Sequence, residues 1–597
     1  MGKVIFDCRN QEYKKPFGAV TGGQAVEYRV FMQDEKRMYF VLRRDDLEEE
    51  QCIPMKRGRN PNEWVHKQRF AEKGLYFYRF ECDGGYIARN PPDSVGYVTD
   101  DPDGGWFIQI VYDGSYIAPA TFAGRVIYQI FPDRFYRESV LKPGFADRVI
   151  HKDLDDIPDF RPVNNKVKNN DFFGGNLKGI EKKLPYLKQL GVGIIYLNPI
   201  FESHSNHRYD TADYMKIDPL LGDEKTFARF CEAARKNDIR IILDGVFSHT
   251  GADSLYFDKY GRYEGGLGAY NNPDSPYRSW YKFDKNEEYG YHSWWGFETL
   301  PEVNETDESF RDFICGGGGV IDHWMSLGAS GFRLDVADEL PDSFIRDIRQ
   351  AIKRHGDDTL LIGEVWEDAS IKIAYGERRQ YLLGEELDSV MNYPFREAIL
   401  DFVREADAGL FIHRVMEIIE NYPKPMMDVM MNLLSTHDTE RLVTSLTQTE
   451  QTRDREWQVK QALSRDDYLR GVEMAKLAFS LLFTLPGLPA VYYGDEIGMQ
   501  GYRDPFNRGY FKWNNIDDNL RDYVAELSET RKENGAFTDG IIVPLTAKDG
   551  CVAYIRQNAV SKVAVIVNRS QETKKIRAGR RVFTVAPWKA VIERIEG

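Results

Sequence analysis

The chain of 597 residues, 42% of them hydrophobic, is long enough for roughly three or four domains with sizeable cores, which excludes a disordered protein. Its formal charge of −15 argues against nucleic acid and anionic membrane surfaces as partners, because phosphate binding needs a basic footprint. Aromatic residues make up 13% of the chain. They either fill cores or form platforms for the apolar faces of sugar rings, and composition leaves both interpretations open.

The six cysteines have neither CxxC nor metal-ligand spacing; they are Cys8, Cys52, Cys82, Cys231, Cys315 and Cys551. We therefore expect buried, reduced thiols rather than disulfides or a metal site. The N-terminal sequence MGKVIFDCRNQEYKK has no apolar h-region, and no uninterrupted apolar run is long enough to span a bilayer. These features predict a cytoplasmic protein without membrane contact, unless a leader has been removed.

Residues 1–120 are predicted to form an N-terminal β-sandwich. Alternating apolar and polar runs such as VEYRVFM, MYFVLRR and GLYFYRFECDG are separated by charged or glycine-bearing turns, and no long helical pattern is present. Such a domain is either a packing unit or a carbohydrate-binding or dimerising module. The sequence favours neither.

From residue 121 to residue 536, short apolar strands alternate with amphipathic helical patterns, for example at 177–191 and 224–238. The strand patterns lie at residues 125–131, 193–200, 239–246, 331–336, 360–366, 389–395, 430–438 and 488–496. Eight alternating units predict a parallel sheet closed into a (β/α)8 TIM barrel. In such a barrel the catalytic groups lie at the C-terminal ends of the strands.

Two further regions complete the predicted multidomain α/β fold. Residues 251–312, between the third and fourth strands, are rich in Gly, Tyr and Trp and too long for an ordinary loop, so we interpret them as an inserted subdomain that forms one wall of a cleft. A helical pattern at 520–534 precedes alternating runs that predict a small C-terminal β-domain at 537–597.

The fourth strand carries a charged pair. Residues two apart on a strand share a face, so Arg333 and Asp335 point the same way, and the guanidinium would hold the carboxylate ionised and oriented. An ionised, oriented carboxylate can act as a nucleophile. Seen alone, such a pair is more often a strand-end ion pair.

Other strand ends add polar groups: Asp244 and His249 after the third strand, Glu364 after the fifth, and His437 and Asp438 after the seventh. An apolar setting provided by the neighbouring Val365 and Trp366 would favour the protonated form of Glu364, making it a proton donor. A nucleophile and a proton donor are the minimum set for retaining glycoside hydrolysis. Metal binding is the main rival interpretation, but the spacing of a dedicated metal cage is missing, so we predict no metal site.

Seven segments in this order resemble the α-amylase superfamily of glycoside hydrolases, and most closely its neopullulanase, cyclomaltodextrinase and maltogenic amylase branch. They are YQIFPDRF, NHRYDTADY, DGVFSHT, GFRLDVADE, GEVWE, STHDTER and YYGDEIGM. The resemblance covers essentially the whole chain. It implies a TIM barrel preceded by a β-sandwich.

The resemblance also implies a role for each matching residue. Asp335 matches the nucleophile, Glu364 the general acid/base, and Asp438 the third carboxylate, which grips sugar hydroxyls. Asp244 matches a structural organiser of the site. Residues that match substrate-binding positions, or that are candidates for lining further subsites, are Arg333, His249, His437, His207, Tyr209, Arg508, Trp295 and Phe297. For Trp295 and Phe297, core packing is the alternative.

The chain also departs from that branch. The branch often carries an Asn- and Asp-rich calcium loop after FPDRF, whereas here the stretch reads YRESVLKPGFADR (136–148) and Asn176 stands where Asp is common. We therefore expect no required cofactor, and structural calcium is doubtful. The motif that usually reads MPKLN is LPEVN at 300–304. Val336, directly after Asp335, is compatible with action on α-1,6 as well as α-1,4 bonds.

Together these observations predict a retaining α-glucan hydrolase that acts on α-1,4 bonds, with some α-1,6 activity, in maltooligosaccharides, cyclodextrins, pullulan or starch fragments. Two alternatives remain: an α-glucan transglycosylase that uses the same carboxylates, and a non-catalytic glucan-binding protein. A homodimer is a further expectation, because in similar proteins the N-terminal sandwich covers the cleft of a partner.

Overall fold

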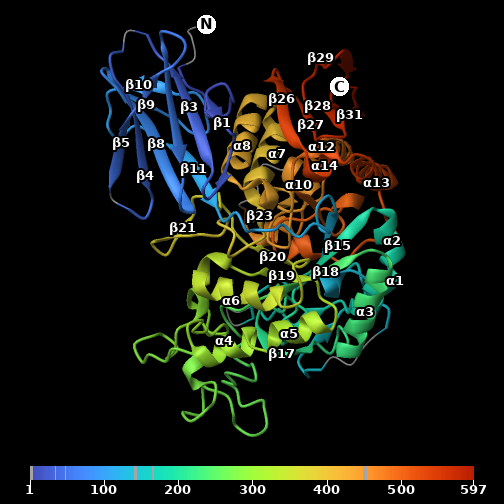
Figure 1. Cartoon of the computed structure of the whole chain (residues 1–597). Coiled ribbons are helices and arrows are strands. Elements are labelled where there is room, and N and C mark those ends of the chain that lie inside the picture. The colour runs from blue at the N-terminus through green and yellow to red at the C-terminus, as the bar shows by residue number, and fades with distance from the viewer. Residues whose placement is uncertain are drawn as a thin grey trace.

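The computed structural model describes residues 5–33, 35–47, 49–139, 144–163, 167–447 and 453–596. Eight parallel strands close into a barrel at its centre (Figure 1), which confirms the predicted fold class. In barrel order the strands are β12 (Val126–Ile130), β15 (Val192–Leu197), β18 (Arg240–Gly245), β19 (Gly331–Leu334), β20 (Leu360–Gly363), β23 (Ser389–Asn392), β24 (Met431–Leu433) and β25 (Leu488–Tyr492). Each falls within, or one residue beyond, a predicted strand.

Helices connect and cover the barrel strands. They are α1 (Leu177–Lys182), α2 (Leu184–Gln189), α3 (Glu224–Lys236), α4 (Glu308–Cys315), α5 (Val320–Ser326), α6 (Asp342–Lys353), α7 (Tyr393–Glu405), α8 (Ala408–Asn421), α9 (Lys424–Met427), α10 (Leu442–Thr447), α11 (Arg455–Gln458), α12 (Arg465–Thr484), α13 (Asp518–Glu533) and α14 (Ala536–Asp539). The single helical pattern expected at 177–191 is divided into α1 and α2. Pro185 stands in the first turn of α2, where its ring and missing N–H are tolerated but would break a continuous helix.

Side chains from alternate positions of the strands fill the barrel interior, as the period of two requires. Ile127, Ile194, Ile242, Ile362 and Leu433 belong to one fully buried cluster there. The outward-facing residues of the same strands pack against the helices in a larger cluster. The charged residues Asp244 and Arg333 lie toward the C-terminal ends of their strands.

The N-terminal region contains two β-sheets, which lie beside the barrel at the upper left of Figure 1. Their strands are β1 (Lys14–Lys15), β2 (Val20–Thr21), β3 (Ala25–Phe31), β4 (Met38–Arg44), β5 (Glu50–Pro54), β6 (Lys56–Arg57), β7 (Glu63–Arg69), β8 (Gly74–Cys82), β9 (Gly85–Ala88), β10 (Tyr97–Thr99) and β11 (Phe107–Tyr112). An aromatic core that includes Tyr28, Phe40, Tyr78 and Phe107 fills the space between the sheets. The predicted β-rich character of this region is confirmed.

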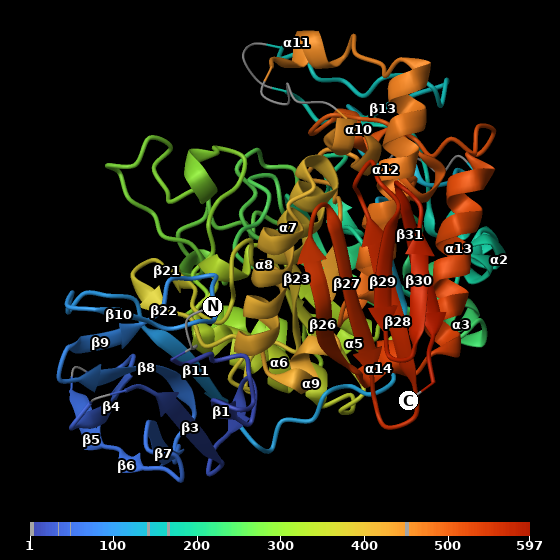
Figure 2. The same ribbon diagram turned by 90° about the horizontal axis from the view of Figure 1, so that it is seen from above.

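A four-stranded antiparallel sheet forms most of the C-terminal region: β26 (Ile541–Lys548), β27 (Cys551–Gln557), β28 (Lys562–Asn568) and β31 (Lys589–Arg594). A separate hairpin, β29 (Lys574–Ala578) and β30 (Arg581–Val585), was not predicted. Helix α8 lies between this region and the N-terminal sheets, as Figures 1 and 2 both show.

Short two-stranded pieces complete the strand inventory: β13 (Val149–Ile150) with β14 (Asp171–Phe172), β16 (Phe201–Ser203) with β17 (Thr211–Ile217), and β21 (Ile373–Ala374) with β22 (Glu377–Arg378). Residues 251–307 form loops with two short 3-10 helices, η2 (Arg278–Trp280) and η3 (Trp294–Gly296). The predicted domain boundaries stay predictions.

All six cysteines are unpaired. Five of them are buried, as expected, but Cys52 is exposed because it lies on β5, at the edge of its sheet. Within the part of the chain that the structure describes, every helix is too short or too polar to cross a bilayer.

A buried ionic cluster joins the N-terminal sheets to the barrel. Glu420 at the end of α8 is 2% exposed. Its carboxylate lies 3.0 Å from Arg9 Nε, 3.6 Å from Arg89 Nη2 and 3.9 Å from Lys14 Nζ. Burial alone would raise the pKa of Glu420, but Lys14, Arg89 and Arg9 together lower it below its ordinary value.

Replacing Glu420 should therefore destabilise the fold. Glu420→Gln leaves buried cations without their shared anion, and we expect the free energy of unfolding to fall by about 3 kcal/mol at neutral pH. The pKa of Glu420 is lower in the folded state than in the unfolded chain. Its contribution to the free energy of unfolding is therefore fully present above the ordinary carboxyl pKa, and it is lost as the pH falls through the pKa of the folded state. The difference from wild type, measured by calorimetric unfolding, should thus shrink below about pH 4.

Glu417→Gln is the matched control, since Glu417 is more exposed and lies 3.5 Å from Arg89. Its effect should stay within about 1 kcal/mol. Equal losses in the two variants would contradict the role given to Glu420.

Candidate active site

Arg333 is the centre of a cluster at the C-terminal mouth of the barrel. Its buried guanidinium places Nη1 2.6 Å from Asp244 Oδ1 and 2.8 Å from Asp335 Oδ1. Nη2 lies 2.8 Å from Glu364 Oε2. The predicted Arg333–Asp335 pair is thus part of a group of four residues from three adjacent strands.

The close approach of β19 and β20 needs a glycine. Gly331 opens β19 with a φ of 152°, and a Cβ atom there would lie 1.9 Å from the carbonyl oxygen of Leu360. Without this side chain the strands pair with Arg333 opposite Ile362. The register brings Arg333 within reach of Glu364, which follows β20.

One guanidinium shared by three carboxyl groups leaves negative charge in excess. Burial raises the pKa of Asp335; Arg333 opposes this rise, while Glu364 and Asp244 add to it. Burial likewise raises the pKa of Asp244 against the effect of Arg333. Burial and the sharing of Arg333 among three carboxyl groups thus work against the ionised form of Asp335, which Arg333 alone was expected to favour.

Glu364 has a more polar setting than the sequence suggested. The backbone N–H of Val336 donates to its Oε2 at 2.9 Å, and the indole N–H of Trp366 donates to its Oε1 at 3.2 Å. Trp366 turns its polar edge to Glu364 while its face stacks on Tyr393, with ring centroids 3.9 Å apart. Val336 has a φ of 38°, unusual for a β-branched residue, and this left-handed turn aims its N–H at the carboxylate.

A second group lies around Asp438. His437 Nε2 is 3.0 Å from Asp438 Oδ2, and Arg508 Nη2 is 3.3 Å from Asp438 Oδ1. The ring of Tyr209 stacks on His437 with centroids 5.4 Å apart and an interplanar angle of 6°. Burial, Arg508 and Arg333 hold the pKa of His437 well below its usual range, so the ring is neutral. Because Gln129 donates to Nδ1 at 3.0 Å, the remaining proton sits on Nε2, which lies 2.6 Å from the Tyr209 hydroxyl as well as 3.0 Å from Asp438.

Hydroxyl and amide groups connect the two clusters. The Tyr209 hydroxyl donates to Asp244 Oδ2 at 2.9 Å, as does the Tyr196 hydroxyl at 2.7 Å. Asn198 donates to the Tyr209 hydroxyl at 3.0 Å and accepts from Gln129 at 3.1 Å. The sequence interpretation missed Gln129, Tyr196 and Asn198, although polar residues in or just after the apolar strands β12 and β15 were a usable signal.

The other predicted histidines lie beside these groups. His207 Nδ1 accepts from the Tyr209 backbone N–H at 3.1 Å. His249 Nδ1 lies 2.9 Å from Ser248 Oγ, and its ring is 5.1 Å from that of Trp294. Burial lowers the pKa of His249 to about 4, so this ring is neutral as well. Its buried Nε2 has no hydrogen-bond partner within the described part of the chain.

The aromatic candidates of the long loop lie at the surface. Trp295 is 76% exposed and Phe297 is 54% exposed, so the core-packing alternative is wrong for both. Trp294, which was missed, stacks on Phe297 with centroids 6.0 Å apart and faces His249 on its other side. These aromatic side chains form a wall that begins at His249 and runs outward.

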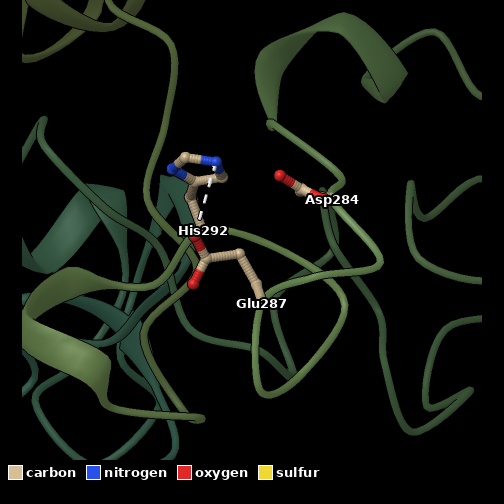
Figure 3. Close-up of side chains that lie close together, drawn as sticks. All are labelled: Asp284, Glu287 and His292. Atoms are coloured by element: carbon tan, nitrogen blue, oxygen red, sulfur yellow. Dashed lines mark ion pairs between the residues drawn. The ribbon is translucent and has the colours of Figure 1, made fainter.

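Two places bear on metal binding. Asn176 Oδ1 accepts from the Gly179 N–H at 2.9 Å and caps α1, which accounts for this residue without a cation. Of the stretch expected to replace the calcium loop, residues 140–143 lie outside the described residues. Among those described, Asp284, Glu287 and His292 have ligand atoms within 4.8 Å of one another, and Figure 3 shows Asp284 pointing toward the His292 ring. This group lies on a partly exposed loop and was not predicted.

Comparisons with known proteins extend these findings. Residues 129–539 match the model described as "Alpha amylase, catalytic domain". The amylopullulanase of Thermoanaerobacter thermohydrosulfuricus is 35% identical over 644 aligned positions, which cover 96% of this chain and 42% of that protein. The cyclomaltodextrinase of Geobacillus thermopakistaniensis is 33% identical over 77% of this chain and 71% of its own length. The chain spans less than half the length of the amylopullulanases that it matches.

Among solved structures, the cyclic α-maltosyl-(1→6)-maltose hydrolase from Arthrobacter globiformis superposes with a TM-score of 0.66 at 28% identity. The match covers 80% of this chain and 99% of that one. Together with the sequence matches, it agrees with the barrel fold described above.

Removing the shared cation should make stability depend on pH. In Arg333→Met the three carboxyl groups lose their counter-charge, so the pKa values of Asp335 and Asp244 rise further and the folded state binds more protons than the unfolded chain. We expect little change in the unfolding free energy at about pH 4 and a loss of about 3 kcal/mol at about pH 8.

Thermal unfolding across this range measures the effect. Arg346→Met is a matched control, because Arg346 is partly exposed and pairs with Glu386 at 2.7 Å outside the cluster. A loss in Arg333→Met that is the same at every pH would refute the shared-charge description.

Proposed function

Because the chain belongs to the alpha-amylase family of glycoside hydrolases, we propose that it is an α-glucan hydrolase that retains the anomeric configuration. Its substrates are α-1,4-linked maltooligosaccharides, cyclodextrins, pullulan or starch fragments, with some action on α-1,6 bonds. Relatives named amylopullulanase and cyclomaltodextrinase support this substrate class. The observation that carries the proposal is the placement of Asp335 and Glu364 on one guanidinium at the mouth of the barrel.

Asp335 is the proposed nucleophile and Glu364 the acid/base. The Asp335 carboxylate attacks the anomeric carbon while Glu364 gives its proton to the glycosidic oxygen, so that the carbon–oxygen bond breaks and the leaving sugar departs with a hydroxyl. Glu364, now a carboxylate, takes a proton from water, which attacks the same carbon and releases Asp335. Two inversions restore the α-configuration.

The charges around Arg333 bear on this cycle. Before reaction, Asp335 must be charged and Glu364 protonated, and the proposal is that one guanidinium shared among three carboxyl groups leaves a proton in the site for this purpose. The contacts from Val336 and Trp366 hold the Glu364 side chain in place during both half-reactions.

The remaining residues are proposed to bind the sugar whose bond is cleaved. Tyr209 offers its ring as a stacking platform, and His437, neutral with a proton on Nε2, is a hydrogen-bond donor. Asp438 accepts from sugar hydroxyls and is itself oriented by His437 and Arg508. His249 Nε2 and the adjacent His207 add further polar contacts.

Substitution of the two carboxylates tests this mechanism. Asp335→Asn removes the nucleophile, and kcat on maltooligosaccharides should fall by about 10^4-fold or more. Glu364→Gln removes the acid, and kcat should fall by about 10^2–10^4-fold. An α-glucosyl fluoride, whose leaving group needs no proton, should recover most of the loss of the first step in Glu364→Gln but none in Asp335→Asn.

Asp103→Asn, a change of an exposed carboxylate in the N-terminal region, serves as control and should leave kcat unchanged. NMR of fresh products should show the α-anomer. Undiminished hydrolysis by Asp335→Asn, or a β-anomeric product, would overturn the mechanism. Longer oligosaccharides formed from concentrated maltotriose would instead assign transfer to a sugar as the main reaction of the same site.

The proposal extends to the cellular location of the protein and to its oligomeric state. Six unpaired cysteines support a reducing compartment such as the cytoplasm. A homodimer built on the N-terminal sheets remains a prediction, and light scattering coupled to size exclusion measures it.

A further inference from the structure

A hairpin of β21 and β22 stands at the edge of the proposed cleft, in the segment that follows Glu364. Its two tip residues, Tyr375 and Gly376, have φ values of 52° and 82°, as a two-residue hairpin turn requires. Glycine suits such a turn, but tyrosine does not, because a side chain is disfavoured there. The turn places the Tyr375 side chain 76% exposed. The backbone alone gives no reason for an aromatic residue at this position.

The base of the hairpin is fastened to the loop that follows Asp335. Lys372 Nζ lies 3.0 Å from Asp338 Oδ2, and the Tyr381 hydroxyl donates to Asp338 Oδ1 at 2.8 Å. Arg379 Nη1 lies 2.9 Å from Asp342 Oδ1. These contacts fix the hairpin to the segment that carries the proposed nucleophile.

A second support comes from the N-terminal sheets, which lie beside the hairpin in Figures 1 and 2. Arg378 donates from Nε and Nη2 to the two oxygens of Asp45 at 2.8 and 3.2 Å, a bidentate pair. With both sides of its base held, the hairpin presents its tip in one place.

Glu339 brings the tip next to the long loop. Its carboxylate accepts from Trp295 Nε1 at 2.7 Å and from Trp294 Nε1 at 2.5 Å. The Tyr375 hydroxyl lies beside the same carboxylate. Partial burial raises the pKa of Tyr375, and the negative charge of Glu339 raises it further. Two widely exposed aromatic side chains from separate segments, Trp295 and Tyr375, thus meet at one carboxylate four residues after Asp335.

We propose that Trp295 and Tyr375 form an aromatic clamp that binds a glucosyl unit of the substrate on the leaving-group side of the cleavage point. A sugar ring has apolar faces and polar edges, which match two aromatic rings with a carboxylate between their polar ends. Trp295, like Tyr375, has a left-handed φ, of 49°, and strained residues of this kind persist where function needs them. Exposed aromatic area of this size also needs an explanation in a folded chain.

The connection of the clamp to the catalytic residues indicates on which side of the scissile bond the clamp lies. Glu364 protonates the leaving oxygen in the proposed function, on which this inference rests, and Trp366 and the hairpin continue the chain from Glu364. The sugar platform Tyr209 and Asp438 lie with His437, in the other cluster. From His249 the wall passes through Trp294 to Trp295, so a glucan chain leaving the cleft reaches the clamp.

Substrate length is the readout that isolates the clamp. In Tyr375→Ala and in Trp295→Ala, kcat/KM for maltoheptaose should fall about 10-fold, mostly through KM, because one stacking face is lost from a subsite that binds substrate and transition state alike. For maltotriose, kcat/KM should stay within about 2-fold of wild type, because this trisaccharide is too short to occupy the clamp while it is being cleaved. Tyr375→Phe, which keeps the ring, should retain most of the maltoheptaose activity.

Tyr97→Ala is the matched control, since Tyr97 is an exposed tyrosine on β10. This variant should change kcat/KM for neither oligosaccharide. Because the clamp side chains are exposed, unchanged thermal unfolding of the variants will separate loss of binding from loss of fold.

Calorimetric titration of maltoheptaose into Asp335→Asn, with and without Tyr375→Ala, measures the clamp independently of turnover. A weaker affinity with the second substitution supports it. Equal effects of Tyr375→Ala on the two oligosaccharides, or none in either assay, would overturn the clamp while leaving hydrolysis in place. Wild-type protein that binds maltoheptaose through Tyr375 but hydrolyses no α-glucan would instead overturn the proposed function and keep the clamp.

Discussion

The contact of one guanidinium with three carboxyl groups organises the mouth of the barrel. Arg333 lies opposite Asp244 in the register of β18 and β19, and it reaches Glu364 because β19 and β20 approach closely at Gly331. Asp244 carries the organisation further through the hydroxyls of Tyr196 and Tyr209. A buried cation that lost these partners, or partners that lost the cation, would be costly, and the three strands are therefore tied to one arrangement.

One guanidinium shared among three carboxyl groups leaves this site with an excess of negative charge. Hydrogen-bond donors rather than aromatic faces contact the two carboxyl oxygens of Glu364. Burial and the neighbouring carboxyl groups raise the pKa of Asp335, because like charges at short range cannot all ionise. The neutral state of His437 and His249 follows from burial and, for His437, from neighbouring guanidiniums, so neither supplies the missing charge.

Local patterns were enough to predict the barrel, since strand alternation and helical spacing are properties of adjacent residues. They also placed Asp335, Glu364 and Asp438 at strand ends. Contacts between distant segments were out of reach: the sharing of Arg333 with Asp244, and the support of the β21–β22 hairpin by Asp45. The break between α1 and α2 was different, because Pro185 was visible in the sequence and its effect on the helix was overlooked.

Through the bidentate pair between Asp45 and Arg378, the N-terminal sheets support the β21–β22 hairpin, which lies 333 positions further along the chain. A barrel separated from those sheets would keep the Arg333 cluster whole, while its hairpin would stand on one support instead of two. In the proposed mechanism and clamp, bond cleavage and the length of glucan bound therefore depend on different parts of the molecule. Such a division lets the length of sugar that is favoured drift through changes in an outlying β-domain, with the chemical step left untouched.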